Sequence, residues 1–456
     1  MNKYQHLLDK HNALFSTHIT KELTWRKQQL KQLKKLVVEN EHEMLTALAE
    51  DLGKPPQESW VTEVSYLTND IDYVLKNLKK WMKARTVYTP IVAQPSRSFI
   101  EAEPLGTVLV IGAWNYPFQL ILAPLIAAIS AGNCALIKPS ELAAASSALL
   151  AKLIPLYLDS DAFSVVEGAV AETTELLELP FDHIMYTGNG LVGKVVMTAA
   201  AKHLTPVTLE LGGKSPVYID KSSNLDVALQ RLAWGKWTNA GQTCIAPDYV
   251  MVTEDMVEAV VDGLKKQINK MYGQHSKNSD SYGRIINERH TKRLQGYLEG
   301  QNIVVGGDID VEQKYISPTI VVNPSLESTL MTEEIFGPIL PMIMVKDFSE
   351  AVEFVNRREK PLAAYLFTKN KAQQNLWNKQ ISSGSQCIND VFMFHAVPEL
   401  PFGGVGKSGM GCYSGKNGFD NFSHYKAIMK RPFLKDPFIR FAPFTDLKLK
   451  LLKLIR

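Results

Sequence analysis

Hydrophobic positions in the first part of the chain follow a helical period. Residues 20–50 place leucine and valine at near-helical spacing among charged residues, namely at Leu23, Leu30, Leu33, Val37, Leu45 and Leu48. Such a stripe predicts one or two amphipathic surface helices. Residues 70–83 predict another helix. Residues 84–104 are β-prone but interrupted by Pro90 and Pro95, so an extended arm or hairpin is expected there.

From residue 105 the pattern changes to short apolar runs that alternate with helical segments. The runs are LGTVLVIG, NCALIKPS, AFSVVEG, HIMYTG and VTLELGG. Strands that are apolar throughout and alternate with helices are typical of parallel sheets covered on both faces. A second alternation runs from about residue 215 to about 412. The sequence therefore predicts an α/β protein with two doubly wound parallel-sheet lobes, and clefts between such lobes bind ligands.

Composition narrows the class of protein. A chain of 456 residues is too long for one compact core. The net charge is +3, from 50 basic and 47 acidic residues, so no global basic field indicates nucleic acid as a partner. The four cysteines form no CxxC, and the histidines are scattered, so no metal site is expected and a reducing compartment is favoured. No signal peptide or membrane-spanning run is visible, and a cytoplasmic location is expected.

A glycine pattern follows the apolar run HIMYT. Gly188, Gly190 and Gly193 form G-x-G-x-x-G between a predicted strand and a predicted helix, which is the context of a dinucleotide-binding fingerprint. Glycines there let the backbone approach a pyrophosphate at a helix N-terminus. A tight turn that binds nothing explains the motif about equally well. The fingerprint also expects an acidic residue about 20 positions later to hold the ribose, and Glu210 lies near that spacing.

Cys244 lies in the polar stretch NAGQTCIAPDY. A free cysteine is most often a small buried hydrophobe. The neighbours of Cys244 form no apolar stripe, however, and Pro247 closes the segment, which favours a nucleophilic thiol in a partly open site. No histidine can be assigned to it as a catalytic partner, so a papain-like hydrolase has no support beyond the thiol.

Asn115 follows directly on the predicted strand GTVLVIG. It therefore lies at the carboxyl end of a parallel strand, where α/β proteins place ligand contacts. Its side-chain amide can donate to an oxyanion. The alternative is that Asn115 only shapes the turn before Pro117.

Taken together and in order, these segments resemble the aldehyde dehydrogenase superfamily, and within it the class 3 group. The matching segments are AWNYPF at 113, IKPSE at 137, YTGNGLVG at 186, VTLELGGKSP at 207, NAGQTCIAPDY at 239, EEIFGPILP at 333, CIND at 387 and LPFGGVGKSGMG at 400. They span about two thirds of the chain. Each motif is weak alone, but the ordered set is specific.

The resemblance implies oxidation of medium to long aliphatic or aromatic aldehydes to carboxylic acids with NAD(P). It implies that Cys244 is the nucleophile, which forms a thiohemiacetal and then a thioester. Asn115 and the Cys244 backbone N–H are implied to hold the oxyanion. Glu210 is implied to be the general base that activates the hydrolytic water, in place of the ribose contact that the fingerprint spacing suggests.

The same resemblance implies the cofactor contacts. They are Lys138 and Glu141 on the adenosine ribose, the turn of Gly188, Asn189, Gly190 and Gly193 on the pyrophosphate, Glu334 on the nicotinamide ribose and Phe336 beside the ring. Asn189 stands where the family often has serine. Because Glu141 would repel a 2′-phosphate, NAD is favoured over NADP, although class 3 members use both.

Pattern and resemblance together suggest a division of the chain. The expected parts are a dinucleotide-binding lobe (1–83 and 105–210), a catalytic lobe (211–415), a β-arm for dimerisation (84–104 and 416–432) and a basic amphipathic tail (433–456). A homodimer is expected, because edge strands of the arm can pair with a second subunit. For the tail, packing on the protein or its partner is favoured over contact with a membrane surface.

Two other functions compete with aldehyde oxidation. An acylating or reductive relative would pass the thioester to coenzyme A or phosphate, and Glu210 argues against it because such enzymes generally lack that base. A non-catalytic binding or structural protein with this fold is the more remote alternative. The intact set of Cys244, Asn115 and Glu210 argues against that second alternative.

Overall fold

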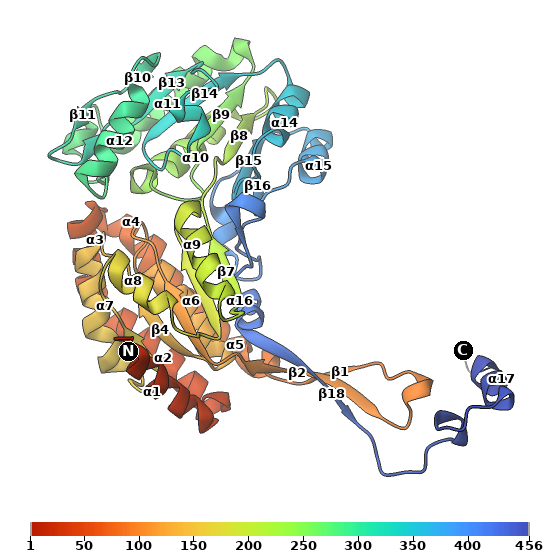
Figure 1. The fold of residues 1–456 in the computed structure, drawn as a ribbon. Coiled ribbons are helices and arrows are strands. Elements are labelled where there is room, and N and C mark those ends of the chain that lie inside the picture. The colour runs from red at the N-terminus through yellow and green to blue at the C-terminus, as the bar shows by residue number, and fades with distance from the viewer. Residues whose placement is uncertain (1, 455–456) are drawn as a thin grey trace.

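The computed structural model describes residues 2–454 and contains two main sheets, one above the other in Figure 1. The first sheet has the order β17-β7-β6-β3-β4-β5. Its strands are β3 (Thr107–Ile111), β4 (Cys134–Lys138), β5 (Phe163–Val165), β6 (His183–Thr187), β7 (Val207–Glu210) and β17 (Gly409–Met410). All neighbours are parallel except β17 and β7.

The second sheet has the order β10-β13-β14-β9-β8-β15-β16. Its strands are β8 (Pro216–Ile219), β9 (Tyr249–Val252), β10 (Ile303–Val305), β13 (Thr319–Val322), β14 (Ile339–Met344), β15 (Ala363–Phe367) and β16 (Ser385–Ile388). Only β10 and β13 pair antiparallel. A separate hairpin joins β11 (Ile309–Asp310) and β12 (Tyr315–Ile316). The predicted α/β class with two doubly wound lobes is confirmed.

Side chains of the first sheet alternate between two apolar cores, one on each face. Val108 and Val110 of β3 belong to one cluster, whereas Leu109 and Ile111 belong to the other. Successive residues of a strand point to opposite faces, so a strand that is apolar at every position needs cover on both sides. Helices supply that cover, which explains the continuous apolar runs.

Helices surround both sheets. Those of the first lobe are α1 (Gln5–Ser16), α2 (Leu23–Glu39), α3 (Glu41–Leu52), α4 (Pro56–Ser59), α5 (Ser65–Trp81), α6 (Gln119–Ala131), α7 (Ala144–Tyr157), α8 (Val170–Leu177), α9 (Gly190–Ala201) and α16 (Gly415–Asn421). Those of the second are α10 (Leu225–Trp237), α11 (Val257–Tyr272), α12 (Glu288–Leu298), α13 (Thr329–Thr332), α14 (Phe348–Asn356) and α15 (Lys371–Gln380). All 13 residues of α6 are buried, as expected of a helix that is apolar all round.

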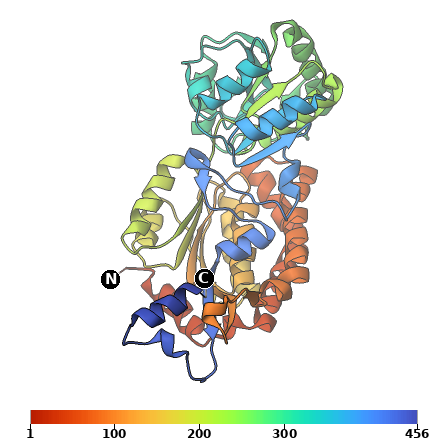
Figure 2. The same ribbon diagram turned by 90° about the vertical axis from the view of Figure 1, so that its right-hand side faces the viewer.

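A three-stranded arm projects from the first lobe, and Figure 2 views it along its length. Its strands are β1 (Arg85–Val87), β2 (Arg97–Pro104) and β18 (Ser423–Lys430). β18 pairs antiparallel with β2 along its whole length. The exposed fractions of Tyr88, Ile91 and Val92 at the arm are 85%, 72% and 77%. The expected extended hairpin is present, and these three side chains are exposed within one subunit.

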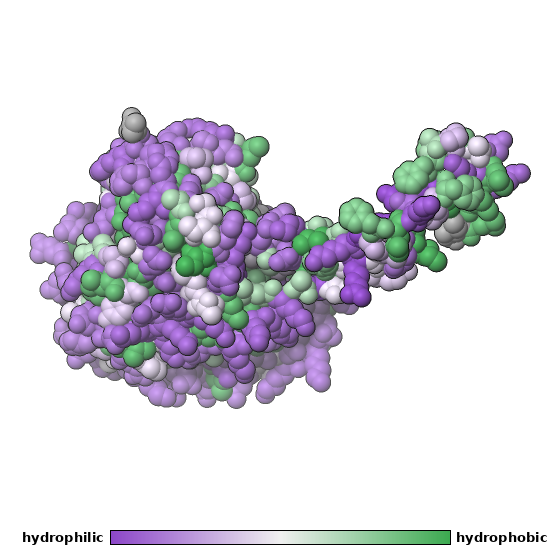
Figure 3. Space-filling model, turned by 90° about the horizontal axis from the view of Figure 1, so that it is seen from below, coloured by the Kyte–Doolittle hydropathy of each residue, from purple (hydrophilic) through white to green (hydrophobic). Residues whose placement is uncertain are grey.

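Beyond β18 the chain continues into a tail that ends in α17 (Asp446–Leu454). No residue of α17 is buried, and Figure 3 shows hydrophobic and hydrophilic side chains side by side on this tail. Across residues 2–454, none of the helices combines the length and the apolarity that crossing a bilayer requires.

The chain re-enters the first lobe at β17, before residue 415, where the sequence suggested that the second lobe ends. β17 pairs with β7, although residues up to 415 were assigned to the second lobe, and α16 packs on α5 and α6, although residues 416–432 were assigned to the arm. A Cβ at Gly409 would overlap the carbonyl of Leu209, so glycine lets these two backbones approach. The functional division of the chain stays a prediction.

Candidate active site

The carboxyl ends of four parallel strands are level at one edge of the first sheet. Ile111, the last residue of β3, pairs with Lys138 at the end of β4. Thr187 at the end of β6 pairs with Glu210 at the end of β7. Asn115 follows β3, and the glycine turn follows β6. The parallel register therefore brings to one edge four groups that are far apart in the sequence.

Asn115 meets the segment that carries Cys244. The Asn115 side chain is buried, and its Nδ2 donates to the carbonyl of Gln242 at 3.0 Å. In return, Asn239 Nδ2 donates to the carbonyl of Asn115 at 2.9 Å. Cys244 itself is only partly buried, in a turn closed by a bond from Ala246 N to Thr243 O. The predicted proximity of Asn115 and the Cys244 segment is thus present.

The backbone before Cys244 adopts a left-handed conformation over three consecutive residues. Asn239, Ala240 and Gly241 have φ values of 53°, 50° and 75°. The carboxamide of Gln242 holds this segment, because its Nε2 donates to Asn239 O at 3.0 Å and its Oε1 accepts from Ile286 N at 2.9 Å. Non-glycine residues in this region store strain of about 1–3 kcal/mol each and cluster at functional sites.

The thiol of Cys244 is poorly ionised in this environment. Burial raises its pKa well above the ordinary value, and the carboxylates of Glu334 and Glu210 raise it further. The main-chain N–H groups of Cys244 and Ile245 act in the opposite direction, because they stabilise negative charge at this position. The same N–H groups are suited to an oxyanion that forms beside the sulfur.

Glu210 is a buried carboxylate without a partner. Its exposed fraction is 3%, and neither side-chain oxygen has a hydrogen-bond partner among residues 2–454. Burial alone raises the pKa of Glu210 well above its usual range. A buried polar group without a hydrogen bond destabilises a fold, so its retention indicates a chemical role. A water molecule or a proton would satisfy this carboxylate.

The residues predicted for the adenosine ribose lie together at the end of β4. Lys138 is buried, and its Nζ donates to Pro139 O at 2.6 Å and lies 3.8 Å from Glu141 Oε2. Burial lowers the pKa of Lys138. The Glu141 side chain is 43% exposed, so its carboxylate remains accessible to a ligand.

The glycine turn opens α9, as the sequence predicted. A Cβ at Gly188 would overlap the hydroxyl of Tyr186, and one at Gly193 would lie 2.9 Å from Leu211. A Cβ at Gly190 would meet nothing within 4 Å. A side chain at Gly188 or Gly193 would therefore displace Tyr186 or Leu211, whereas Gly190 borders open space at a helix N-terminus that can receive a phosphate. Asn189 caps α9, because its Oδ1 accepts from Val192 N at 3.0 Å.

Glu334 lies over the turn that follows Glu210. A Cβ at Gly212 would overlap the Glu334 carboxylate, so only glycine permits this approach. Burial raises the pKa of Glu334 to about 8, and the neighbouring carboxylate of Asp248 contributes. The Phe336 ring meets Trp114 edge to face at 5.3 Å between ring centroids. The predicted cofactor residues of the second lobe therefore face the strand ends of the first.

Lys214 and Asp248 support the segment of Glu334, and sequence reasoning assigned no role to either. Lys214 Nζ pairs with the Asp248 carboxylate and donates to the carbonyl of Glu333 at 2.8 Å. Asp248 Oδ1 accepts from Ile335 N at 3.0 Å. Both residues lie inside the matching motifs at 207 and 239, so the motifs themselves were the available signal.

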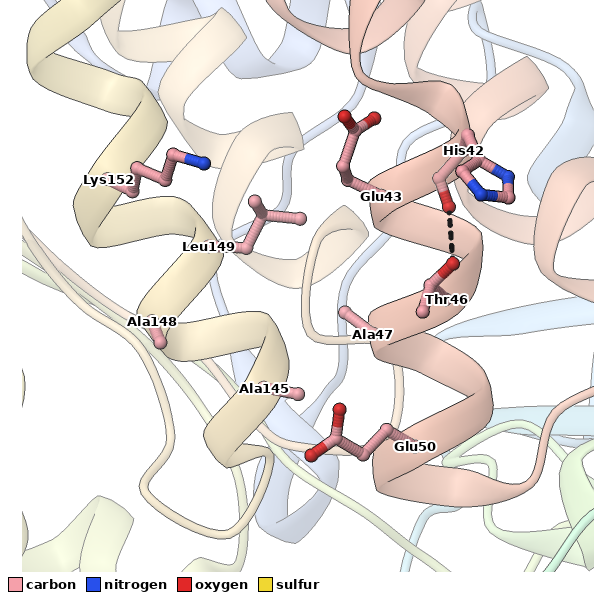
Figure 4. A pocket seen from close by; sticks show the side chains of 9 residues that line it. All are labelled: His42, Glu43, Thr46, Ala47, Glu50, Ala145, Ala148, Leu149 and Lys152. Carbon is pink, nitrogen blue, oxygen red and sulfur yellow. Dashed lines mark hydrogen bonds between the residues drawn. The ribbon is translucent and has the colours of Figure 1, made fainter.

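The pocket in Figure 4 lies between α3 and α7 and is separate from these groups. Its lining residues are His42, Glu43, Thr46, Ala47, Glu50, Ala145, Ala148, Leu149 and Lys152. None of them is a predicted site residue. Within the described residues, 2–454, no group of three or more His, Cys, Asp or Glu side chains is arranged to hold a metal ion.

Comparison with known proteins agrees with this geometry. The model of the aldehyde dehydrogenase family matches residues 3–428. The chain is 46% identical to the dimeric NADP-preferring aldehyde dehydrogenase of Canis lupus familiaris, over 96% of each chain. It is 49% identical to aldehyde dehydrogenase family 3 member A2 of Mus musculus, over 91% of this chain and 86% of that protein.

A solved structure is also similar over the whole chain. The substrate-bound state of Staphylococcus aureus AldH superimposes with a TM-score of 0.97 at 42% sequence identity, covering 100% of this chain and 99% of that one. The arm and the tail thus lie within the compared region.

Replacing Glu210 by glutamine tests the electrostatic state of this carboxylate. The folded state raises the pKa of Glu210, so ionisation opposes folding as the pH rises above the ordinary value of 4.5. Glutamine cannot ionise, and we expect the thermal stability of Glu210→Gln relative to wild type to rise as the pH increases from 5 towards neutral. Differential scanning fluorimetry across this range measures the gain. The control is Glu312→Gln, at an exposed position. An equal dependence of stability on pH in both variants would contradict the raised pKa of Glu210.

Proposed function

The chain belongs to the aldehyde dehydrogenase family, and on this premise we propose that it oxidises medium to long aliphatic or aromatic aldehydes through a thioester on Cys244. Oxidation of an aldehyde with NAD(P) is the activity of the family, and the protein is an aldehyde dehydrogenase. The observation that carries the proposed mechanism is that Asn115 and Glu210, at the carboxyl ends of the first sheet, lie close to the Cys244 segment of the second lobe, with no hydrogen-bond partner for Glu210 among residues 2–454.

Cys244 acts as the nucleophile. Its sulfur forms a bond to the aldehyde carbon, the thiol proton passes to a water molecule, and the π bond of the carbonyl opens so that its oxygen becomes an oxyanion. Asn115 Nδ2 has two N–H bonds, and only one of them is directed to Gln242 O, so the second can donate to this oxyanion together with the Cys244 N–H. A donor of this kind contributes about 3–4 kcal/mol to the transition state.

The residues present fit a nicotinamide dinucleotide. Gly190 leaves space at the N-terminus of α9 for the pyrophosphate, and the half-exposed Glu141 carboxylate is accessible to a ribose. Glu334 and Phe336 would hold the nicotinamide end. The bound cofactor supplies the hydride acceptor of the reaction. Because the Glu141 carboxylate would repel a 2′-phosphate, we favour NAD over NADP for this chain, although the relative from Canis lupus familiaris is NADP-preferring.

Glu210 completes the reaction as general base. After hydride loss the acyl group remains on the Cys244 sulfur. Glu210 accepts a proton from a water that attacks the thioester carbon, the carbon–sulfur bond breaks, and the carboxylic acid leaves. The raised pKa means that this carboxylate, when ionised, is a stronger base than an exposed one. This base argues against the two alternative functions. Transfer of the acyl group to coenzyme A would not need Glu210, and a non-catalytic protein would not need Cys244, Asn115 and Glu210 together.

We also propose that the protein is a homodimer joined by the arm. The exposed side chains of Tyr88, Ile91 and Val92 provide apolar area that a partner subunit would cover. The tail carries exposed phenylalanines and leucines among basic residues, and packing on the partner is favoured over a membrane surface. A dimeric relative and the continuity of tail with arm support this preference. A cytoplasmic location stays a prediction.

Two substitutions separate the chemical steps. We expect Cys244→Ser to abolish aldehyde-dependent NADH formation. We expect Glu210→Gln to give one equivalent of NADH per site in a burst, followed by turnover reduced about 10²–10⁴-fold, because the thioester persists. Stopped-flow absorbance without and with coenzyme A measures both phases. Normal steady-state turnover of Glu210→Gln without an added acyl acceptor would show that the base is another group.

The cofactor preference is tested at Glu141. Glutamine at this position removes the charge that repels a 2′-phosphate, so the ratio of kcat/KM for NADP to that for NAD should rise about tenfold. Steady-state kinetics with both cofactors measure the ratio, and exposed Glu175→Gln of the same lobe is the control. An unchanged ratio in Glu141→Gln would place the discrimination elsewhere.

The dimer is tested at the arm. Val92→Glu puts a charge into the proposed interface, and we expect the dimer dissociation constant to rise at least about tenfold, since burial of such a side chain contributes about 1.5–3 kcal/mol. Sedimentation equilibrium measures the constant. Val170 has the same exposed fraction of 77% as Val92 but opens α8, so Val170→Glu is a matched control. Equal association of both variants would exclude the arm as the interface.

A further inference from the structure

A buried ion pair lies behind Asn115, on a segment to which the sequence assigned no chemistry. Lys54 follows α3, and Glu63 lies in the π-helical turn Trp60–Val64 between α4 and α5. The side chains of both are fully buried, and Lys54 Nζ lies 2.9 Å from Glu63 Oε1. Single π-helical turns are rare and occur frequently at functional sites.

This pair holds the backbone on both sides of the Asn115 segment. Lys54 Nζ donates to the carbonyl of Asn115 at 3.2 Å. The second oxygen of Glu63 accepts from the N–H groups of Phe118 at 2.9 Å and Gln119 at 3.1 Å, at the start of α6. The loop between β3 and α6 is therefore fixed at Asn115 itself and again three residues later.

The pair also reaches the segment of Cys244. Lys54 Nζ lies 4.2 Å from the centre of the Tyr116 ring, and the Tyr116 hydroxyl is hydrogen-bonded to Thr243 Oγ1 at 2.7 Å. Thr243 directly precedes Cys244. A single ammonium group thus contacts the residue proposed to hold the oxyanion and, through one tyrosine, the residue next to the nucleophile.

A neighbouring carboxylate reinforces this arrangement. Glu58 of α4 accepts from the main-chain N–H of Asn239 at 2.8 Å, and Asn239 Nδ2 donates to the same Asn115 carbonyl that Lys54 contacts. The short segment from Lys54 to Glu63 therefore contacts both catalytic loops, one from each lobe.

Stability alone does not account for a buried ion pair at this position. Replacing such a pair by apolar side chains of similar volume is often neutral or stabilising, because desolvation of the two charges offsets their attraction. An apolar pair, however, could not donate to the Asn115 carbonyl and accept from two N–H groups. Only polar groups such as Lys54 and Glu63 can make these hydrogen bonds to the Asn115 segment.

We propose that Lys54 and Glu63 are positioning residues, which hold the Asn115 amide in the geometry required for addition of the Cys244 sulfur to the aldehyde. The proposal rests on the role proposed above for Asn115. Displacement of a catalytic group by about 1 Å reduces a rate by about 10²-fold. Loss of the pair therefore slows the first chemical steps and leaves cofactor binding intact.

The test compares two variants of the pair with a matched control. Lys54→Met leaves the Glu63 carboxylate buried and unpaired, so Lys54→Met/Glu63→Gln, which removes both charges and keeps an acceptor oxygen, is made beside it. The control is Arg26→Met. Arg26 is also a buried cation, and its Nη1 donates at 3.0 Å to the carbonyl of Ser130, at the far end of α6 from Asn115.

The main measurement is the rate constant of NADH formation in the first turnover, which precedes thioester hydrolysis. We expect it to fall about tenfold to 10²-fold in both pair variants, with the dissociation constant of NAD within about twofold of wild type. Arg26→Met is expected to lose thermal stability and to keep its first-turnover rate. A normal rate in the double variant would overturn the proposal.

A second comparison uses Asn115→Ala. If the pair acts through Asn115, the double variant slows the first turnover in the wild-type background but adds less than about twofold in the Asn115→Ala background. Equal slowing in both backgrounds would mean that the pair acts by a route other than Asn115, and would overturn this inference while leaving the proposed function in place. A wild-type rate in Asn115→Ala would instead refute the oxyanion role, and with it the premise of the inference.

Discussion

The parallel hydrogen-bond register of the first sheet is the constraint on which the active site depends. Because the last residues of β3 and β4 pair with each other, and those of β6 and β7 do the same, every group that follows these strands emerges at one level. The second lobe then only has to present one segment, residues 239–244, and one turn around Glu334. Since parallel strands need cover on both faces, the apolar pattern that forms the cores also determines where the polar groups emerge.

This coupling explains why so much could be predicted from the sequence. A strand that is apolar at every position can be located from its composition, and the polar residue that follows it is then placed at the carboxyl edge. Asn115 and Gly188 were found in this way, whereas Glu210 was found from its spacing after the glycine motif. The resemblance to a family was needed where spacing misleads, since the fingerprint alone would make Glu210 a ribose contact. The structure shows Glu210 buried and without a hydrogen-bond partner among residues 2–454, whereas Glu141 is accessible.

The role of the buried pair Lys54 and Glu63 could not be predicted from the sequence, for a physical reason. Lys54 and Glu63 lie between amphipathic helices, where isolated charges are normally solvated, and their spacing matches no motif. Their partners are 61 and 55 residues away in sequence, and Glu63 reaches the start of α6 from a π-helical turn that no periodicity predicts. The return of β17 to the first sheet depends likewise on a close backbone approach at Gly409, which no periodicity encodes.

The two proposed catalytic groups Asn115 and Glu210 differ in how firmly hydrogen bonds hold them, and the difference suits their roles. An oxyanion donor is effective only if it already points at the developing charge, and the carbonyl of Asn115 is held by two donors while its amide is oriented by Gln242. A general base must instead exchange protons with a water that arrives after the first product-forming step, and any permanent partner would compete with that water. Glu210 has none among the described residues. Burying this carboxylate without a partner among residues 2–454 costs stability, and it leaves the carboxylate available to that water.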